Sequence, residues 1–309
     1  MWGPCPSLDK MRTILTWRAK ALSVTLVLAL TVAACADEGS SGDDRPLVVV
    51  TTTILGDVVT RVGGGAVRVV VLMPPGADPH EYAASASDAA TMHDASLVVT
   101  NGLGLESGLA DALATLDGRV SVLAVGDGVD PRYFAGGVAD PHFWTDLSRM
   151  SVATTAIRDA LVAAAPGSAA EIEAATVAYQ QELADLDDEV MALLAGIPAE
   201  GRLLVANHDF LGYFADRYGF EVVGSLIPGG STIEEPGAAE LAALADLIVE
   251  RGVRAVFAEG TKPTDLAEAL AAEAGGLPLV VLQSGALPEG GSYIDLVRGD
   301  ATLIADALK

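Results

Sequence analysis

Short apolar runs rich in valine and leucine recur along the chain in two groups, and the long stretch between the groups contains none. The first group of expected strands covers Leu47–Ile54, Arg68–Met73, Leu97–Asn101 and Val120–Val125. Segments of helical character, Ser87–Ala95 and Ser107–Leu116, lie between them. Nearly continuous apolar strands that alternate with helices are typical of a parallel sheet covered on both faces. We therefore expect residues 46–146 to form one α/β lobe.

The second group repeats this alternation over residues 200–309. The expected strands are Arg202–Ala206, Glu221–Leu226, Ala255–Ala258 and Pro278–Leu282. The expected helices are Phe210–Tyr218, Ala238–Arg251, Thr264–Ala274 and Tyr293–Leu308. The sequence thus predicts an α/β protein with two similar, Rossmann-like parallel-sheet lobes. Ligands of open α/β sheets bind beyond the carboxyl ends of the strands, so a shared site is expected between the lobes.

The stretch between the groups, residues 147–199, predicts connecting helices. Ser168 stands three residues before Glu171, which is the spacing of a capping box, and Gly196-Ile197-Pro198 ends the helical pattern. Apolar residues recur between these points in steps of three and four, at Ile172, Ala175, Tyr179, Leu183, Leu186, Val190 and Leu194. This spacing predicts one long, rigid helix with a single apolar stripe linking the lobes, and hence only modest motion of one lobe against the other.

The N-terminus has the pattern of an export signal. Basic residues precede an apolar run from Ala21 to Val32, and Val32-Ala33-Ala34-Cys35 follows. A basic segment, a short apolar segment and small residues form a cleavable signal. The cysteine predicts a lipoprotein signal peptide over residues 1–35, with Cys35 lipidated; an ordinary secretory signal with an incidental cysteine is the alternative. Translation can begin at Met1 or Met11. Residues 36–45 are a polar tether, and the mature protein is expected outside the cytoplasm on a lipid anchor at the cell membrane.

Composition limits the partners and the ligands. The formal net charge is -24, which argues against nucleic acid as a partner because phosphate binding needs clustered Lys and Arg. The two cysteines are Cys5 and Cys35, both in the N-terminal segment. Any metal site in the folded part must therefore use nitrogen and oxygen ligands.

Three of the four histidines lie at or near similar edges of the expected lobes. Two of them come after expected strands, and His142 lies near the end of the first lobe, before the connecting helices. His80 and His142 both occur in an Asp-Pro-His sequence, and His208 follows the apolar run Leu203–Asn207. Histidines delivered from separate segments to one edge predict a metal site, and three imidazoles suit zinc, copper or nickel better than hard cations. The fourth histidine, His93, lies within an expected helix and is interpreted as a surface or packing residue.

Carboxylates surround these histidines. One or more of them is expected to accept the second ring N–H of a ligand histidine. The candidates are Asp78, Asp140, Asp146 and Asp209. For Asn207 and Asp209, capping of the following helix is the alternative.

A fourth ligand is expected from the second lobe. Glu259, at the end of the run Ala255–Ala258, is the best-placed carboxylate; its alternative is an ion pair with Lys262 or a helix cap. Glu234 and Glu235, after the turn at Gly229-Gly230, are weaker candidates.

Four motifs together resemble the zinc/manganese solute-binding lipoproteins of bacterial metal ABC importers, also called the cluster A-I family. They are Gly76-Ala77-Asp78-Pro79-His80-Glu81-Tyr82, Asn101-Gly102-Leu103-Gly104-Leu105-Glu106, Asp140-Pro141-His142-Phe143-Trp144-Thr145-Asp146 and Asn207-His208-Asp209-Phe210-Leu211-Gly212-Tyr213-Phe214. The resemblance implies a metal held between two lobes, with His80 and His142 as first-lobe ligands and His208 as the third. It also implies zinc as the metal, with manganese possible, and an ABC permease with its ATPase as partners.

The chain departs from this family at two points. Gly285 stands where an aspartate ligand is often found, so either Glu259 reaches the metal or water completes a three-histidine site. Residues 127–138 contain no histidine, although zinc-binding members often have a His-rich loop there.

The leading hypothesis is a monomeric extracytoplasmic protein, not an enzyme, that captures zinc and delivers it to a permease. A manganese-binding member of the same family is the nearest alternative. A zinc hydrolase would also use three histidines with an open fourth position, but the chain has no His-Glu-x-x-His pair. A binder of an organic ligand such as haem would make the histidines incidental.

Overall fold

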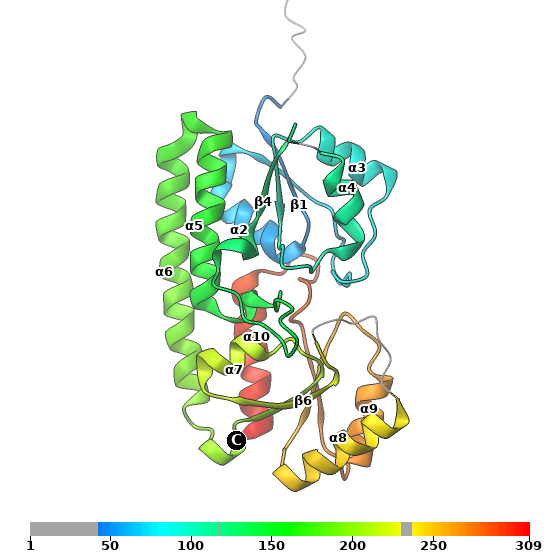
Figure 1. Ribbon diagram of the computed structural model, residues 1–309. Helices are drawn as coiled ribbons and strands as arrows, with labels where there is room; N and C mark the ends of the chain where they lie inside the picture. The colour runs from blue at the N-terminus through cyan, green and yellow to red at the C-terminus, as the bar shows by residue number, and fades with distance from the viewer. Residues whose placement is uncertain (1–42, 117, 230–236) are drawn as a thin grey trace, which may run out of the picture. The chain divides into compact units, whose positions relative to one another are not determined.

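Two four-stranded parallel sheets organise the molecule, and residues Arg45–Lys309 form one compact unit around them (Figure 1). The computed structural model describes residues 43–116, 118–229 and 237–309. The predicted signal peptide, Cys35 and most of the tether therefore lie outside the described residues, as do Glu234 and Glu235. The described helices include none that is both long and apolar enough to cross a membrane.

The first sheet has the strand order β2-β1-β3-β4, and every pairing in it is parallel. Its strands are β1 (Leu47–Val50), β2 (Arg68–Val71), β3 (Leu97–Thr100) and β4 (Ser121–Ala124). The helices of this lobe are α2 (Thr53–Gly63), α3 (Ala86–His93) and α4 (Ala110–Ala114). The central strands β1 and β3 are buried at all their positions, as expected for strands covered on both faces.

The first expected strand, Leu47–Ile54, was predicted too long. The strand ends at Val50, and α2 begins at Thr53. The Thr52 side chain accepts a hydrogen bond from the backbone of Leu55 and so caps the helix. β-Branched threonines favour a strand in isolation, but here one of them starts a helix.

The second sheet repeats this topology with the order β6-β5-β7-β8, again all parallel. Its strands are β5 (Leu203–His208), β6 (Glu221–Ile227), β7 (Val256–Glu259) and β8 (Leu279–Leu282). Its helices are α7 (Gly212–Tyr218), α8 (Ala238–Arg251) and α9 (Asp265–Glu273). The predicted class, two similar α/β lobes, is confirmed. The division of the chain into domains at residues 46–146, 147–199 and 200–309 remains a prediction.

Three long helices lie alongside the two sheets. They are α5 (Leu147–Ala164), α6 (Ala169–Leu194) and α10 (Tyr293–Leu308). The 26 residues of α6 extend about 39 Å at 1.5 Å per residue, and the helix packs against α2 of the first lobe and against α10 (Figure 1). The predicted capping box is wrong: the side chain of Ser168 caps nothing, because Pro166–Ser168 forms a 3-10 turn that leads into the helix.

Short 3-10 turns complete the described elements. They lie at Gly64–Ala66, Ser107–Leu109, Val125–Gly128, Phe143–Thr145, Pro166–Ser168 and Ala199–Gly201.

Buried contacts fasten the two lobes to each other. One apolar core runs from the first sheet through α5, α6 and α10 into the second lobe. The indole Nε1 of Trp144 donates to the carbonyl of Ser284 at 2.7 Å, and the hydroxyl of Tyr293 donates to the carbonyl of Trp144. The backbone N–H of Leu287 donates to Thr53 Oγ1 at 2.8 Å. Buried apolar packing with internal hydrogen bonds is costly to separate, so the lobes are held as one body.

Candidate metal centre

The three predicted histidines meet where strand ends of the two lobes face each other. His80 lies in the turn that follows β2, His142 precedes the 3-10 turn Phe143–Thr145, and His208 is the last residue of β5. Each histidine contributes one ring nitrogen, and these three nitrogens all lie within 4.8 Å of one another. His80 is 7% exposed, and the other two are fully buried. Residues up to 128 positions apart in sequence thus share one small, enclosed volume.

The spacing of the His80 and His142 ring nitrogens fits one edge of a tetrahedral metal site. The Nε2 atoms of His80 and His142 are 3.2 Å apart. Zinc bound by imidazole at 2.0–2.1 Å would place two ligand nitrogens about 3.3 Å apart along one edge of a tetrahedron. The Nε2 atom of His208 is buried without a hydrogen-bond partner. A metal ion would satisfy this nitrogen, which is otherwise costly to bury.

Each histidine is oriented by a different neighbour. Asp140 Oδ1 lies 2.9 Å from Nδ1 of His142, which leaves the Nε2 of that ring free as a ligand. The Nδ1 of His208 lies 3.3 Å from Oδ1 of Asn207. Asp78 Oδ1 accepts from the backbone N–H of His80 at 2.8 Å and so shapes its turn.

The other two carboxylates predicted around the histidines make their described contacts elsewhere. Asp146 caps α5 by accepting from the backbone of Ser148, and it pairs with Arg149 at 2.6 Å. Asp209 accepts from the backbone N–H of Gly229 at 3.0 Å. Neither contact involves an imidazole, so these two residues support the surrounding loops.

Burial keeps two of the imidazoles neutral. Desolvation, reinforced by the neighbouring His142, lowers the pKa of His80 to about 4. Desolvation, with His142 and His80 next in weight, also lowers the pKa of His208 well below its usual value. Neutral imidazole is the form that binds a metal, so these two rings need lose no proton to bind at neutral pH.

Glu259, the last residue of β7, is buried beside the histidines. Its Oε2 lies 3.6 Å from Nε2 of His208, and burial raises the pKa of its carboxyl group. The hydroxyls of Thr261 and Ser284 donate to this carboxylate at 3.1 Å and 3.2 Å. The alternative partner Lys262 instead pairs with Asp78 and Glu81.

Gly285 lies against the Glu259 carboxylate. A Cβ atom built on Gly285 would come within 2.7 Å of the carboxyl carbon and of Oε1 of Glu259. Any side chain at this position would therefore have to displace Glu259. The missing side chain at Gly285 thus leaves the space that the inward-facing Glu259 carboxylate occupies.

The sequence motif Asn101–Glu106 supports the metal centre, a role that was not predicted from the sequence. Glu106 is buried, and its Oε1 accepts from the hydroxyl of Thr51 at 2.7 Å and from the backbone N–H of Asn101 at 2.6 Å. The amide of Asn101 donates to the carbonyl of Pro141 at 3.0 Å. This chain of contacts ties the ends of β1 and β3 to the residue before His142. The glycines and the glutamate at fixed spacing were the available signal.

His93 is remote from this centre. It ends α3, is exposed, and contacts Thr115 Oγ1 through Nε2 at 3.1 Å. The interpretation of His93 as a surface residue is confirmed.

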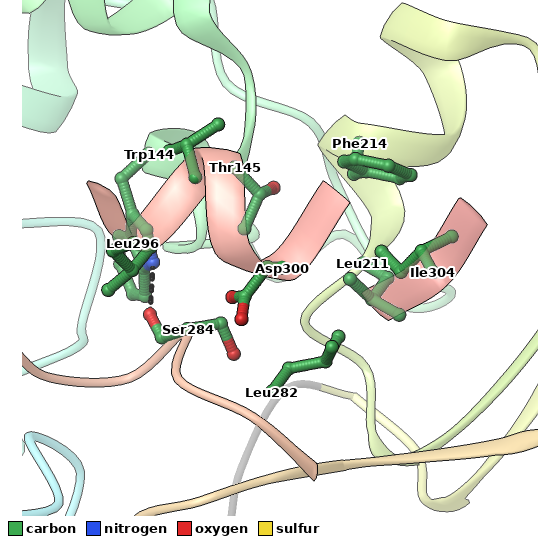
Figure 2. Close-up of a pocket in the computed structure, with 10 residues that line it drawn as sticks. Trp144, Thr145, Leu211, Phe214, Leu282, Ser284, Leu296, Asp300 and Ile304 are labelled. Atoms are coloured by element: carbon green, nitrogen blue, oxygen red, sulfur yellow. Dashed lines mark hydrogen bonds between the residues drawn. The ribbon is translucent and has the colours of Figure 1, made fainter. Parts of the chain in front are cut away.

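A small cavity of about 20 Å³ lies beside Ser284 (Figure 2). Residues of the turn Phe143–Thr145, of the second lobe and of α10 line it. Asp300 of α10 faces it, and its Oδ1 accepts from the backbone N–H of Gln283 at 2.8 Å. Burial raises the pKa of Asp300 to about 7, against the opposing effect of this hydrogen bond. Asp300 thereby anchors the loop that contains Ser284 and Gly285.

Two parallel-sheet lobes joined by a long helix, with three histidines buried between them, define the class of two-lobed metal-binding proteins. Residues 48–307 match the family described as "Zinc-uptake complex component A periplasmic", and the chain belongs to this family. This membership confirms the resemblance found in the sequence. It also agrees with the prediction that the protein is a binding protein and not an enzyme.

The chain is similar to both zinc- and manganese-binding relatives. It is 35% identical over 240 residues to the "Zinc-binding protein TroA" of Treponema pallidum, covering 77% of each chain. It is 31% identical over 237 residues to the "Manganese-binding lipoprotein MntA" of Bacillus subtilis, covering 75% of this chain and 77% of the relative. The solved structure of the periplasmic zinc-binding TroA superposes with a TM-score of 0.81 at 34% identity, over 85% of this chain and 99% of that one.

Proposed function

We propose that this protein is the extracytoplasmic binding component of a metal ABC importer and that its cargo is zinc(II). His80, His142 and His208 are the proposed nitrogen ligands, and Glu259 is the proposed fourth ligand. Binding is then the whole activity: the protein captures the ion and delivers it to a membrane permease driven by its ATPase.

The observation that supports this function most directly is the buried Nε2 of His208, which has no hydrogen-bond partner beside two further imidazoles. A buried nitrogen of this kind is stabilised by a cation at its lone pair. The contact between Asp140 and His142 adds the outer partner that metal-bound histidines usually have.

Zinc is favoured over manganese by the chemistry of the ligands. Three imidazoles form a nitrogen-rich set, whereas manganese prefers carboxylate, carbonyl and water oxygens. Manganese-binding relatives exist in the family, so a manganese cargo is the second outcome to be tested.

The membrane association proposed for the protein depends on Cys35. The lipobox pattern Val32-Ala33-Ala34-Cys35 and the lipoprotein names of several relatives support a lipid anchor, followed by the polar tether 36–45. We also propose that the protein acts as a monomer.

A competition titration tests the cargo. The metal-free fragment from Ala36 to Lys309 is titrated with zinc against a chelator of known affinity, with and without excess manganese. The proposal expects one tight zinc site that manganese does not displace. Easy displacement by manganese would favour the manganese alternative, and the absence of any tight site would contradict the proposed function.

A further inference from the structure

The candidate ligands are closed off from solvent. His80 is 7% exposed, Glu259 is 1% exposed, and His142 and His208 are fully buried. A metal ion can therefore enter or leave only when one wall of the site moves.

The wall that contains His142 is fixed by buried contacts to the second lobe. The hydroxyl of Tyr213 donates to the carbonyl of Asp140 at 2.7 Å, and Trp144 donates to the carbonyl of Ser284 at 2.7 Å. His208 is itself part of the central strand β5. Moving His142 or β5 out of place would expose apolar core and leave buried polar groups without hydrogen bonds.

The turn that contains His80 is held to the second lobe in a different way. The ammonium of Lys262 lies 2.7 Å from Asp78 Oδ2 and 2.5 Å from Glu81 Oε1. Asp78 precedes His80 by two residues, and Glu81 follows it directly. Lys262 lies three residues after Glu259, on the turn that leaves β7. Two ion pairs therefore bridge the His80 turn and the turn of the candidate fourth ligand.

We propose that Lys262 is a latch: it holds the His80 turn closed against the second lobe and slows the release of the metal. This role rests on the proposed function, because the metal concerned is the one held by the same histidines. Lys262 is a positioning residue and not a ligand, since an ammonium ion has no free electron pair for a metal.

The unequal burial of the two ion pairs suits a latch that holds the turn closed but can open. The Lys262 and Asp78 side chains are 14% and 7% exposed, whereas Glu81 is 55% exposed. The shielded contact to Asp78 is screened little by solvent, and the exposed contact to Glu81 is weak. Water can reach the bridge from the Glu81 side, so it can open without disrupting the apolar core.

A groove already lies along the bridged turns. Its volume is about 280 Å³, and Pro75 and Gly76 of the His80 turn line it together with Gly260 and Thr261 from the turn of Lys262. Thr261 also donates its hydroxyl to Glu259. Separation of the two turns would therefore widen an existing groove toward the metal centre.

The charge of Lys262 acts on the metal in the opposite direction to the latch. Its ammonium disfavours positive charge on His80 and on His208, so it also repels a bound cation. If charge were its only effect, removing it would slow zinc release. If it is a latch, removing it speeds release, so the sign of the change distinguishes the two roles.

The test measures zinc release from the full chain, purified in detergent, into excess chelator by stopped flow. For Lys262→Met we expect release at least about fivefold faster, the effect of losing a partly buried ion pair, and Lys262→Arg should stay near the parent rate. Arg251→Met is the matched control, because Arg251 forms a 2.7 Å pair with Glu221 within the second lobe. Its release rate should equal that of the parent.

Hydrogen exchange of the metal-free protein gives a second readout that needs no zinc. The latch predicts faster exchange of backbone amides over residues 76–82 in Lys262→Met than in the parent, with no such change in Arg251→Met. Unchanged exchange there, or zinc release that is unchanged or slower, would overturn the latch. If the parent binds no zinc, the proposed function fails, and the exchange measurement alone decides whether Lys262 holds the turn.

Discussion

At the scale of single residues, the centre depends on a few side chains whose neighbours leave one nitrogen of each ring available. Asp140 occupies Nδ1 of His142, and Asn207 lies beside Nδ1 of His208. The Nε2 atoms of both rings are directed into the shared space. We expect the loss of a ligand to weaken zinc binding more than the loss of an outer partner does.

Replacement of His208 tests the ligand set. We expect His208→Ala to weaken zinc binding by more than about 100-fold, beyond the loss caused by removing an outer partner of a ligand. His93→Ala is the control, since His93 is exposed and distant, and its affinity should match the parent. Competition titration measures both, and a His208→Ala variant that binds zinc like the parent would remove His208 from the site.

Replacement of Asp140 tests the outer contact. Asp140→Asn keeps the size of the side chain but removes the charge beside Nδ1 of His142. We expect zinc affinity to fall by about 10- to 100-fold. The same titration measures this fall. No change would mean that Asp140 serves only to shape its turn.

Replacement of Gly285 tests the link between the missing aspartate and Glu259. A methyl group on Gly285 would lie 2.7 Å from the Glu259 carboxyl carbon, so Gly285→Ala should displace this carboxylate and weaken zinc binding. Gly299→Ala is the matched control, because a Cβ atom there meets no atom within 4 Å. If titration gives equal affinities for the two variants, Glu259 is not part of the metal centre.

The sequence could predict the three histidines because Asp-Pro-His marks two of them, and the third, His208, follows an apolar run. It could not predict which carboxylates contact the rings. Asp78, Asp140 and Asp209 are all one or two residues from a histidine, and only the folded turns decide that Asp140 meets an imidazole while Asp209 meets the backbone of Gly229. The supporting contacts of Glu106 link β1 and β3 with Pro141, and such long-range contacts leave little local signal.

At the scale of elements, α10 has a direct influence on the loop beside the metal centre. Asp300 projects from this helix into the cavity (Figure 2). Its Oδ1 accepts a hydrogen bond from the backbone N–H of Gln283, one residue before Ser284. Its carboxyl group is buried next to a cavity that has room for about one water molecule.

Asp300 makes the stability of the fold depend on pH. Its folded-state pKa of about 7 exceeds the usual 3.8, so the folded protein binds this proton more tightly than the unfolded chain. The resulting stability is present below pH 3.8 and is lost as pH rises toward 7. Asp300→Asn cannot ionise and keeps an acceptor for Gln283. We expect it to be more stable than the parent at pH 8, by at most about 4 kcal/mol, with the difference vanishing near pH 4.

Urea unfolding of both proteins at the two pH values measures this effect. Asp306→Asn on the same helix is the control, because Asp306 is exposed. Equal stabilities of Asp300→Asn and the parent at pH 8 would contradict the assigned role of the buried carboxyl group.

Elements with a regular spacing of apolar residues were predictable, but the residues at which they begin and end were not. The apolar stripe of α6 identified a long helix, because its residues contact the core at every turn. The sequence suggested that Ser168 begins this helix with a capping box, but Pro166 imposes a 3-10 turn in which the hydroxyl has no such partner. Likewise, Thr52 ends β1 by capping α2, a choice that local β-propensity does not reveal.

At the scale of the whole molecule, the two lobes have the same strand order, and the helices α6 and α10 contact both of them. The repeated alternation of strands and helices was enough to predict this architecture. The arrangement of the lobes depends on buried contacts between distant residues, such as Trp144 with Ser284, and the sequence alone did not indicate them.

This arrangement predicts little movement of one lobe against the other when the metal binds. The apolar core that crosses α5, α6 and α10 would have to open for a wide hinge motion. We therefore expect small-angle X-ray scattering to give the same radius of gyration, within error, for the zinc-loaded and chelator-treated protein. A clear contraction on zinc binding would contradict a rigidly joined pair of lobes.

The central claim is that zinc lies among three imidazoles with one carboxylate. X-ray absorption at the zinc edge of the stoichiometrically loaded protein tests it most directly, because it reports the atoms bound to the metal. The account predicts four-coordinate zinc with three imidazole nitrogens at about 2.0–2.1 Å and one oxygen, and Glu259→Gln should change the oxygen contribution while preserving the imidazole signal. A first shell made mainly of oxygen, or one without the imidazole signal, would contradict the account.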